Sequence, residues 1–187
     1  MEKETKVFVI AVSLLIVVGM QGYAATSDEH TTSSNVTISN YVAVGLSTNL
    51  STGILFGEID PNTLNNNATH DYDGAASATT YYVDVSSDSN INIDMCIKDN
   101  THLTRTAGGV IANGNYTWAD NATANSVAMS PANSYVMPTA YHRTNVTDIA
   151  PGSNDYFRFW LDVPGGQTPG SYNNTVYFKG IVTAGSC

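Results

Sequence analysis

Asp155-Tyr156-Phe157-Arg158-Phe159-Trp160-Leu161-Asp162-Val163 is the stretch of this sequence that decides the fold. Apolar side chains occupy every second position from Phe157 to Val163, and polar or amphipathic side chains fill the positions between them. Alternation with a period of two predicts a β-strand whose odd-numbered side chains face a core and whose even-numbered side chains face outward. A turn rich in glycine and proline at residues 164–170 leads into the strand-like run 172–183. We therefore expect a long closing hairpin.

The same alternation recurs upstream, whereas no segment beyond residue 25 keeps apolar residues at helical spacing for three turns. It predicts strands at residues 35–47, 53–59, 79–86 and 91–98. Asp60-Pro61 ends the second of these because proline cannot donate to a strand ladder, and an Asn- and Asp-rich loop is expected at residues 62–74. The turn Ser87-Asp88-Ser89-Asn90 predicts that the third and fourth strands pair as a hairpin.

The middle of the sequence gives weaker strand signals. Its candidates are short and separated by glycine, asparagine and proline, at residues 110–111, 116–118, 126–129, 135–137 and 139–143. We expect short strands and long loops there. Eight or nine short antiparallel strands with such turns predict an all-β fold, a single antiparallel β-sandwich of Greek-key or jelly-roll type over residues 25–187.

Residues 1–24 have the order of a secretory signal peptide: a charged start, an apolar run at residues 7–20, and small residues up to Ala24. The run is about 14 residues long, below the roughly 20 that span a bilayer. We expect cleavage after Ala24 and an extracellular, cell-surface protein that has no membrane contact once the signal is removed. An uncleaved anchor is the alternative.

The charge balance beyond residue 24 is strongly acidic. Removing the two acids and two bases of the first six residues from totals of 16 and 7 leaves fourteen Asp and Glu against five Lys and Arg. Such a surface repels phosphate backbones and anionic lipids, so nucleic acid is not an expected partner. Asparagine, serine and threonine replace charge as the solvating residues.

The sequence contains seven Asn-x-Ser/Thr acceptors for N-glycosylation, six of them with threonine. They are Asn35, Asn49, Asn67, Asn115, Asn121, Asn145 and Asn173. A densely glycosylated exterior is one interpretation. Incidental matches in an asparagine-rich loop surface are the other.

The two cysteines, Cys96 and Cys187, predict a disulfide because an even pair in an oxidising compartment usually forms a bridge. The closed loop of about 90 residues is worth roughly 4 to 5 kcal/mol in the chain-entropy model. Two free thiols or a bond between subunits are the alternatives.

Catalytic motifs are missing from the sequence. The four histidines lie in separate polar contexts, and there is no nucleophile elbow, phosphate loop or Cys-x-x-Cys. We expect a protein that is not an enzyme and has no resident cofactor. Asp71 and Asp73 precede Gly74 in an oxygen-rich stretch and are candidate calcium ligands, with a plain Asn-rich loop as the alternative.

Several aromatic residues could form a platform that stacks on a surface polysaccharide. They are Tyr81, Tyr82, Trp118, Tyr141, Tyr156 and Trp160. Aromatic side chains on a sheet face more often bury themselves against a loop or another subunit. Both interpretations stay open at this point.

Residues 25–47 comprise a polar leader followed by the first predicted strand. Its apolar side chains share one face: Val36, Ile38, Val42, Val44 and Leu46. A long apolar strand behind a polar leader can be separated from its own domain, so it is a candidate donor strand that pairs with a neighbouring subunit. Packing within its own domain is the alternative.

Two stretches carry a resemblance to a known family. Gly53-Ile54-Leu55-Phe56-Gly57-Glu58-Ile59-Asp60-Pro61-Asn62-Thr63 is followed much later by Pro164-Gly165-Gly166-Gln167-Thr168-Pro169-Gly170-Ser171-Tyr172, which runs into Val176-Tyr177-Phe178. The pattern resembles archaeal extracellular filament subunits, the bundling pili and threads related to the TasA-like secreted β-sandwich family. The resemblance implies a non-enzymatic building block whose N-terminal segment inserts as a strand into the next subunit.

The sequence therefore leads to two hypotheses on function. The first is a structural subunit of an extracellular filament, pilus or biofilm fibre, a homopolymer built by β-strand addition between subunits. The alternative is a secreted β-sandwich module that binds carbohydrate or cell wall.

Overall fold

The structure, a computed structural model, describes residues 32–187. Its internal contacts divide the chain into two units, Met1–Ile38 and Ser39–Cys187. The predicted signal peptide and the start of the polar leader lie outside the described residues. Within the first unit, residues 32–38 belong to no helix or strand.

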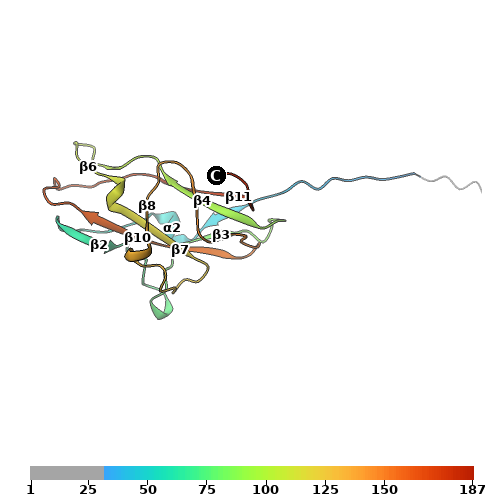
Figure 1. Ribbon diagram of the computed structural model, residues 1–187, viewed down its shortest axis with the longest axis horizontal. Coiled ribbons are helices and arrows are strands. Elements are labelled where there is room, and N and C mark those ends of the chain that lie inside the picture. Colours follow the sequence, from blue (N-terminus) through green and yellow to red (C-terminus); the bar gives the residue numbers. More distant parts are fainter. Residues whose placement is uncertain (1–31) are drawn as a thin grey trace, which may run out of the picture. The chain divides into compact units, whose positions relative to one another are not determined.

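The second unit is built from antiparallel sheets, and the largest has six strands. The order of five of them is β1 (Val44–Leu46), β3 (Tyr82–Val85), β10 (Asn154–Val163), β7 (Tyr116–Asn121) and β8 (Tyr135–Val136), and β2 (Thr63–Asn67) also pairs with β10. β10 therefore lies at the centre of this sheet (Figure 1). β7 pairs with one side of it, and β3 and β2 pair with the two ends of its other side.

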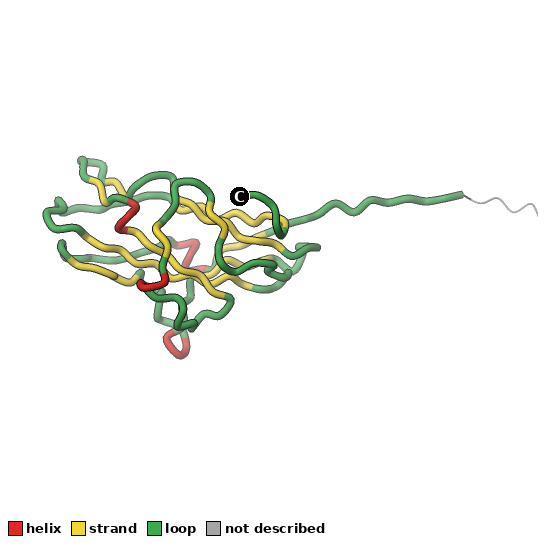
Figure 2. Tube along the Cα trace, viewed as in Figure 1, coloured by secondary structure: helices red, strands yellow, loops and turns green. Residues whose placement is uncertain are grey.

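A second sheet has three strands and a third has two. The three-stranded sheet has the order β11 (Val176–Val182), β4 (Ile93–Asp99) and β9 (His142–Arg143), and the small sheet pairs β5 (Leu103–Thr104) with β6 (Val110–Ile111). Within residues 32–187, helical structure is confined to α2 (Thr48–Thr52) and the 3-10 turns η1 (Ala75–Ser77), η2 (Asn113–Asn115) and η3 (Pro131–Asn133). Figure 2 shows these as short turns among strands and loops.

The two larger sheets share one hydrophobic core. Val83 of β3, Ile93 of β4 and Trp118 of β7 all belong to it and are fully buried. Phe157 of β10 meets Phe178 of β11 edge to face, with ring centroids 5.2 Å apart. The predicted all-β class and the inward face of β10 are therefore confirmed.

Both predicted hairpins are wrong. β3 lies in the six-stranded sheet and β4 in the three-stranded sheet, and the same division separates β10 from β11. Each connection crosses from one sheet to the other because both strands it joins carry an apolar face that the core must cover. The turn at residues 86–90 is used differently: Ser89 Oγ accepts from Ala43 N at 3.0 Å, and Asn90 Oδ1 accepts from Tyr41 N at 2.8 Å.

The lengths of the early strands also differ from the prediction. Of residues 35–47 only Val44–Leu46 is a strand, and residues 53–59 form none. Ser47 ends the first strand because its hydroxyl accepts from Leu50 N at 3.2 Å and caps α2. Conversely, β2 occupies part of the predicted loop 62–74, and residues 126–129 contain no strand.

The outward face of β10 is covered by loops, which the alternation did not predict. Trp160 is only 1 % exposed and packs with Ala119 and Met129. Arg158 is also buried, and its guanidinium donates to the carbonyls of Ser77 and Met129 at 2.8 and 3.0 Å. β10 is consequently buried on both faces from Phe157 to Leu161.

Among residues 32–187, no helix has the length and apolar character needed to cross a membrane.

Candidate assembly surface and the predicted sites

β11 is an edge strand with one open side. Asn100 N donates to Thr175 O and Thr183 N donates to Asn92 O, which places the odd-numbered residues of this strand in hydrogen-bonded pairs with β4. The backbone groups of the even-numbered residues Val176, Phe178 and Gly180 therefore point away from β4. Within the described part of the chain, no strand pairs with that side.

The side chains of β11 suit an edge that stays open in a single subunit. Val176 and Phe178 pack against the core, whereas Tyr177 and Lys179 face outward. A charged lysine on such an edge opposes uncontrolled pairing with other strands. Gly180 allows close approach of the two sheets, since a Cβ there would lie 2.9 Å from Val44 Cγ1.

The predicted donor strand falls into two groups. Val42 packs against the core, and Val44 and Leu46 lie in β1, which pairs with β3 of the same chain. Val36 and Ile38 are 82 % and 78 % exposed. Val44 and Leu46 are 38 % and 45 % exposed but are held in β1, so Val36 and Ile38 are the members of the set that are exposed and belong to no strand.

The predicted disulfide is confirmed within one chain, with a Cα–Cα distance of 6.0 Å between Cys96 and Cys187. It holds the C-terminal residues across the outer face of β4. Asp94 on that face accepts from Ala184 N at 2.9 Å and forms an ion pair with Arg143 at 3.1 Å. Arg143 also donates to the carbonyl of Gly185. The C-terminus is therefore fixed by the disulfide and by backbone hydrogen bonds to the ion-paired Asp94 and Arg143.

None of the seven predicted glycosylation acceptors is buried. The acceptors classed as exposed are Asn35, Asn67, Asn145 and Asn173, and the half-buried ones are Asn49, Asn115 and Asn121. Two of them already donate through the amide nitrogen that would carry the sugar, Asn49 to Thr80 Oγ1 at 2.7 Å and Asn145 to Asp120 Oδ1 at 2.8 Å. Glycosylation stays a prediction, with the fewest structural demands at Asn35.

Asp71 and Asp73, the predicted calcium ligands, have separate partners. Asp71 is buried and accepts from the backbone N–H groups of Ala68 and Phe159, at 3.1 Å to the nearer oxygen in each case. Burial raises the pKa of Asp71 to about 8, although both N–H groups and Arg158 lower it. Asp73 bonds instead to His70 and Thr80, and its pKa is lowered by those hydrogen bonds. Asp71 and Asp73 are therefore not arranged as ligands of one shared calcium ion.

The aromatic residues proposed as a sugar platform do not lie on one exposed face. Tyr81, Trp118 and Trp160 are buried, so they are not accessible for stacking on a polysaccharide. Tyr141 remains partly exposed and lies 4.8 Å from Lys98 Nζ, measured to the ring centroid. The alternative interpretation, burial against a loop, holds for Trp160, which packs with Met129, whereas Trp118 lies in the main core.

Metal-ligating side chains do not gather in the described residues 32–187, where no group of three or more His, Cys, Asp or Glu is placed to share an ion. His30 lies outside this range. His102 bonds to Asn113, and His142 meets Trp118 edge to face with ring centroids 6.3 Å apart.

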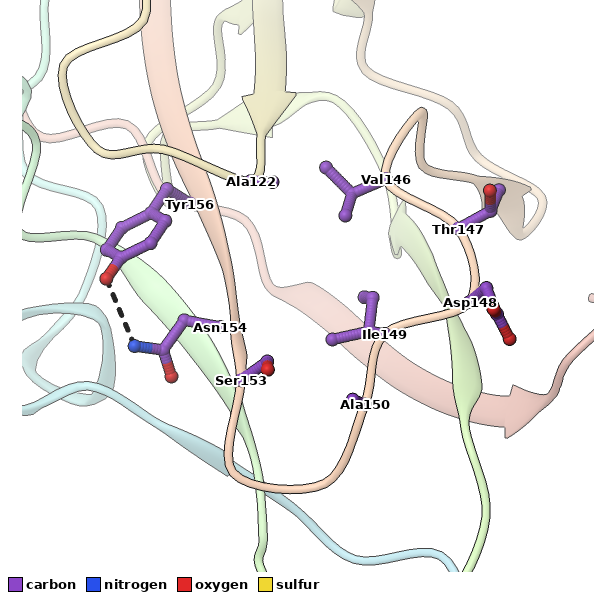
Figure 3. A pocket seen from close by; sticks show the side chains of 9 residues that line it. All are labelled: Ala122, Val146, Thr147, Asp148, Ile149, Ala150, Ser153, Asn154 and Tyr156. Carbon is purple, nitrogen blue, oxygen red and sulfur yellow. Dashed lines mark hydrogen bonds between the residues drawn. The ribbon is translucent and has the colours of Figure 1, made fainter.

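A shallow depression of about 520 Å³ lies where the loop at residues 146–153 meets the start of β10. Figure 3 shows Val146 and Ile149 on one side of it and Asn154 and Tyr156 on the other. Asn154 Nδ2 donates to Tyr156 Oη at 3.1 Å. The depression is open and carries few polar groups that converge on its centre.

Two buried carboxylates adjoin this depression and were not singled out by sequence reasoning. Asp155 lies between Asn154 and Tyr156 in β10, and Asp120 lies near the end of β7. Burial raises the pKa of both, and the charge of Asp120 adds to the effect at Asp155. The signal was present in the alternation, since Asp155 shares the inward parity of Phe157.

No family model, curated protein or solved structure matches this chain.

Proposed function

We propose that this protein is a secreted structural subunit of an extracellular filament, pilus or biofilm fibre. In this proposal the two larger sheets form a single β-sandwich of Greek-key or jelly-roll type, and subunits join by strand addition. The observation that carries it is the presence in one chain of an exposed alternating segment, with Val36 and Ile38, and an open strand edge on β11.

Strand addition suits both features physically. An extended segment that pairs with β11 would supply hydrogen-bond partners for the backbone groups of Val176, Phe178 and Gly180. Every second side chain of that segment would at the same time be buried from water. The donor and acceptor surfaces are different parts of the chain, so the contact is heterologous and can repeat without closing. The resulting assembly is a homopolymer.

The donor segment in this proposal is shorter than the sequence predicted. Val42, Val44 and Leu46 already belong to their own domain, so residues 34–39 around Val36 and Ile38 are the part that can be donated. The intrachain disulfide is compatible with an oxidising extracellular location, and a building block needs no catalytic site.

Negative-stain electron microscopy of the mature protein tests the proposal. The wild-type chain should form filaments, and Ile38→Asp should reduce filament growth at least tenfold while the monomer keeps its thermal transition. Ser39→Asp is the matched control, because it adds the same charge one position away on the opposite side of the extended segment and leaves the Asn35 acceptor intact.

Monomers of wild-type protein under all polymerising conditions would contradict assembly. Equal loss of filaments in the Ile38 and Ser39 variants would contradict the donor segment. Specific retention of monomers on a polysaccharide column would instead favour the carbohydrate- or cell-wall-binding alternative.

A further inference from the structure

Asp120 and Asp155 are inward-facing carboxylates on neighbouring strands. Asp120 follows Trp118 on the core side of β7, and Asp155 precedes Phe157 on the core side of β10. The register pairs Phe157 with Asp120, so Asp155 is the diagonal neighbour of Asp120. Such diagonal positions lie about 7 to 8 Å apart, which lets the tips of two side chains approach a common point.

Asp155 has no close hydrogen-bond partner among the described residues. The residue is 0 % exposed, and neither carboxylate oxygen is paired with any group of the described chain. An ionised carboxylate buried without a partner costs several kcal/mol. At neutral pH its inward position therefore calls for either a bound proton, which burial favours by raising its pKa, or a cation.

Asp120 is only partly neutralised by its surroundings. Its two oxygens accept from Asn145 Nδ2 at 2.8 Å and from Val146 N at 2.9 Å, both neutral donors. Neither Asp120 nor Asp155 forms a salt bridge with the basic residues of the described chain. Arg143, the ion-paired arginine of the neighbouring sheet, is bound to Asp94.

A third oxygen lies beside Asp155. Thr144 is buried, and its hydroxyl is close enough to Asp155 to lower the pKa of that carboxyl. The hydroxyl contacts the carbonyls of Met95 and Val146 at 3.3 Å. The donor set is thus carboxylate and hydroxyl oxygen, with no sulfur or imidazole, which matches a hard cation such as calcium.

The open depression lies next to the segments that carry these oxygens. Its lining includes Val146, whose N–H bonds to Asp120, and Asn154 and Tyr156, which flank Asp155 in sequence (Figure 3). Asp120, Thr144 and Asp155 do not line the depression, so the ion would bind beneath it, with water completing the six to eight oxygen ligands that calcium takes.

We propose that Asp120 and Asp155, together with the Thr144 hydroxyl, bind one calcium ion between β7 and β10. The ion neutralises the two carboxylates and fixes the loop at residues 144–153, which connects the three-stranded sheet to β10. This site is separate from the Asp71 and Asp73 pair and does not depend on filament assembly.

Calorimetric titration and thermal unfolding of the oxidised mature chain test the site. Calcium chloride should bind at one ion per chain and, at a hundredfold excess over the dissociation constant, raise Tm by about 5 to 10 °C over the value in chelator. Asp155→Asn should abolish both effects, because the amide keeps the shape of the carboxyl and removes its charge. Asp88→Asn, an exposed acid in a turn, is the matched control and should keep them.

Absence of calcium binding to the wild-type chain would overturn the proposal and would leave Asp155 as a protonated, neutral acid. Binding that survives Asp155→Asn but is lost in Asp73→Asn would also overturn it. If Asp155→Asn does not fold, wild-type protein still decides: terbium should show emission sensitised through Trp118, two residues from Asp120, and calcium should displace it. Terbium emission that calcium leaves unchanged would count against the site.

Discussion

β10 and β11 look alike in sequence and differ in nearly every structural respect. Both alternate apolar with polar side chains, and both were predicted as halves of one hairpin. β10 lies within the six-stranded sheet, is paired along both edges, and has loops over its outward face. β11 lies at the edge of the three-stranded sheet and keeps Tyr177 and Lys179 in solvent. Alternation therefore reports which side chains face the core and says little about what covers the opposite face.

Truncating an aromatic side chain should give the largest difference in unfolding free energy between the two strands. Phe159→Ala in β10 should cost about 3 to 5 kcal/mol of unfolding free energy, because the ring is fully buried and leaves a cavity. Tyr177→Ala in β11 should cost less than about 1 kcal/mol, since its ring is 42 % exposed. Chemical denaturation of both variants measures the difference, and equal costs would contradict the distinction between the strands.

The disulfide should be the next largest contribution, and it acts on the sheet that contains β11. Replacing Cys96 and Cys187 together by alanine should lower the unfolding free energy by about 2 to 5 kcal/mol, because the bridge closes a long loop. Guanidinium denaturation with and without a reducing agent provides the measurement. Ser186→Ala is the control, and an unchanged midpoint after reduction would mean that the other bonds of the C-terminus suffice.

The carboxylate that bonds to the backbone of β10 should make stability depend on pH. Burial raises the pKa of Asp71 from 3.8 to about 8. The folded chain therefore keeps a proton that the unfolded chain releases, so this contribution is complete below about pH 4 and is lost as the pH rises through about 8.

Tm measured from pH 5 to pH 8 should accordingly fall more steeply in wild-type protein than in Asp71→Asn. The variant should also lose about 1 to 2 kcal/mol at pH 5, because its amide meets N–H groups that a carboxyl oxygen accepted. Asp88→Asn controls for charge alone. Parallel pH profiles in wild-type and Asp71→Asn protein would show that Asp71 does not titrate in this range.

The smallest expected effect concerns the open edge of β11. Val182→Pro should change the unfolding free energy by less than about 1 kcal/mol, because the N–H that proline removes points away from β4. Lys179→Pro is the matched contrast and should cost about 3 kcal/mol, since its N–H belongs to the ladder with β4. Similar losses of unfolding free energy in both variants would show that the side of β11 facing away from β4 is also hydrogen-bonded.

Sequence reasoning found the chemistry of the candidate sites unevenly. The cysteine pair was identified because two thiols in a chain with a predicted secretory signal have few other uses, and the structure confirms their bridge. The buried Asp120 and Asp155 were missed, although both share the inward parity of their strands. A carboxyl at an inward position signals a site only when its neighbours across the sheet are known, and those depend on register.

The sequence by itself determined the all-β class, the core-facing side chains of β10 and the presence of a disulfide. Each follows from a local property: alternation, or the pairing of two thiols. Strand partners, the burial of Arg158 and Trp160, and the open edge of β11 were decided only by the tertiary structure. The reason is that side-chain alternation is the same for a strand at the centre and at the edge of a sheet. Long-range hydrogen bonds and loop packing distinguish the two, and neither leaves a local trace in the sequence.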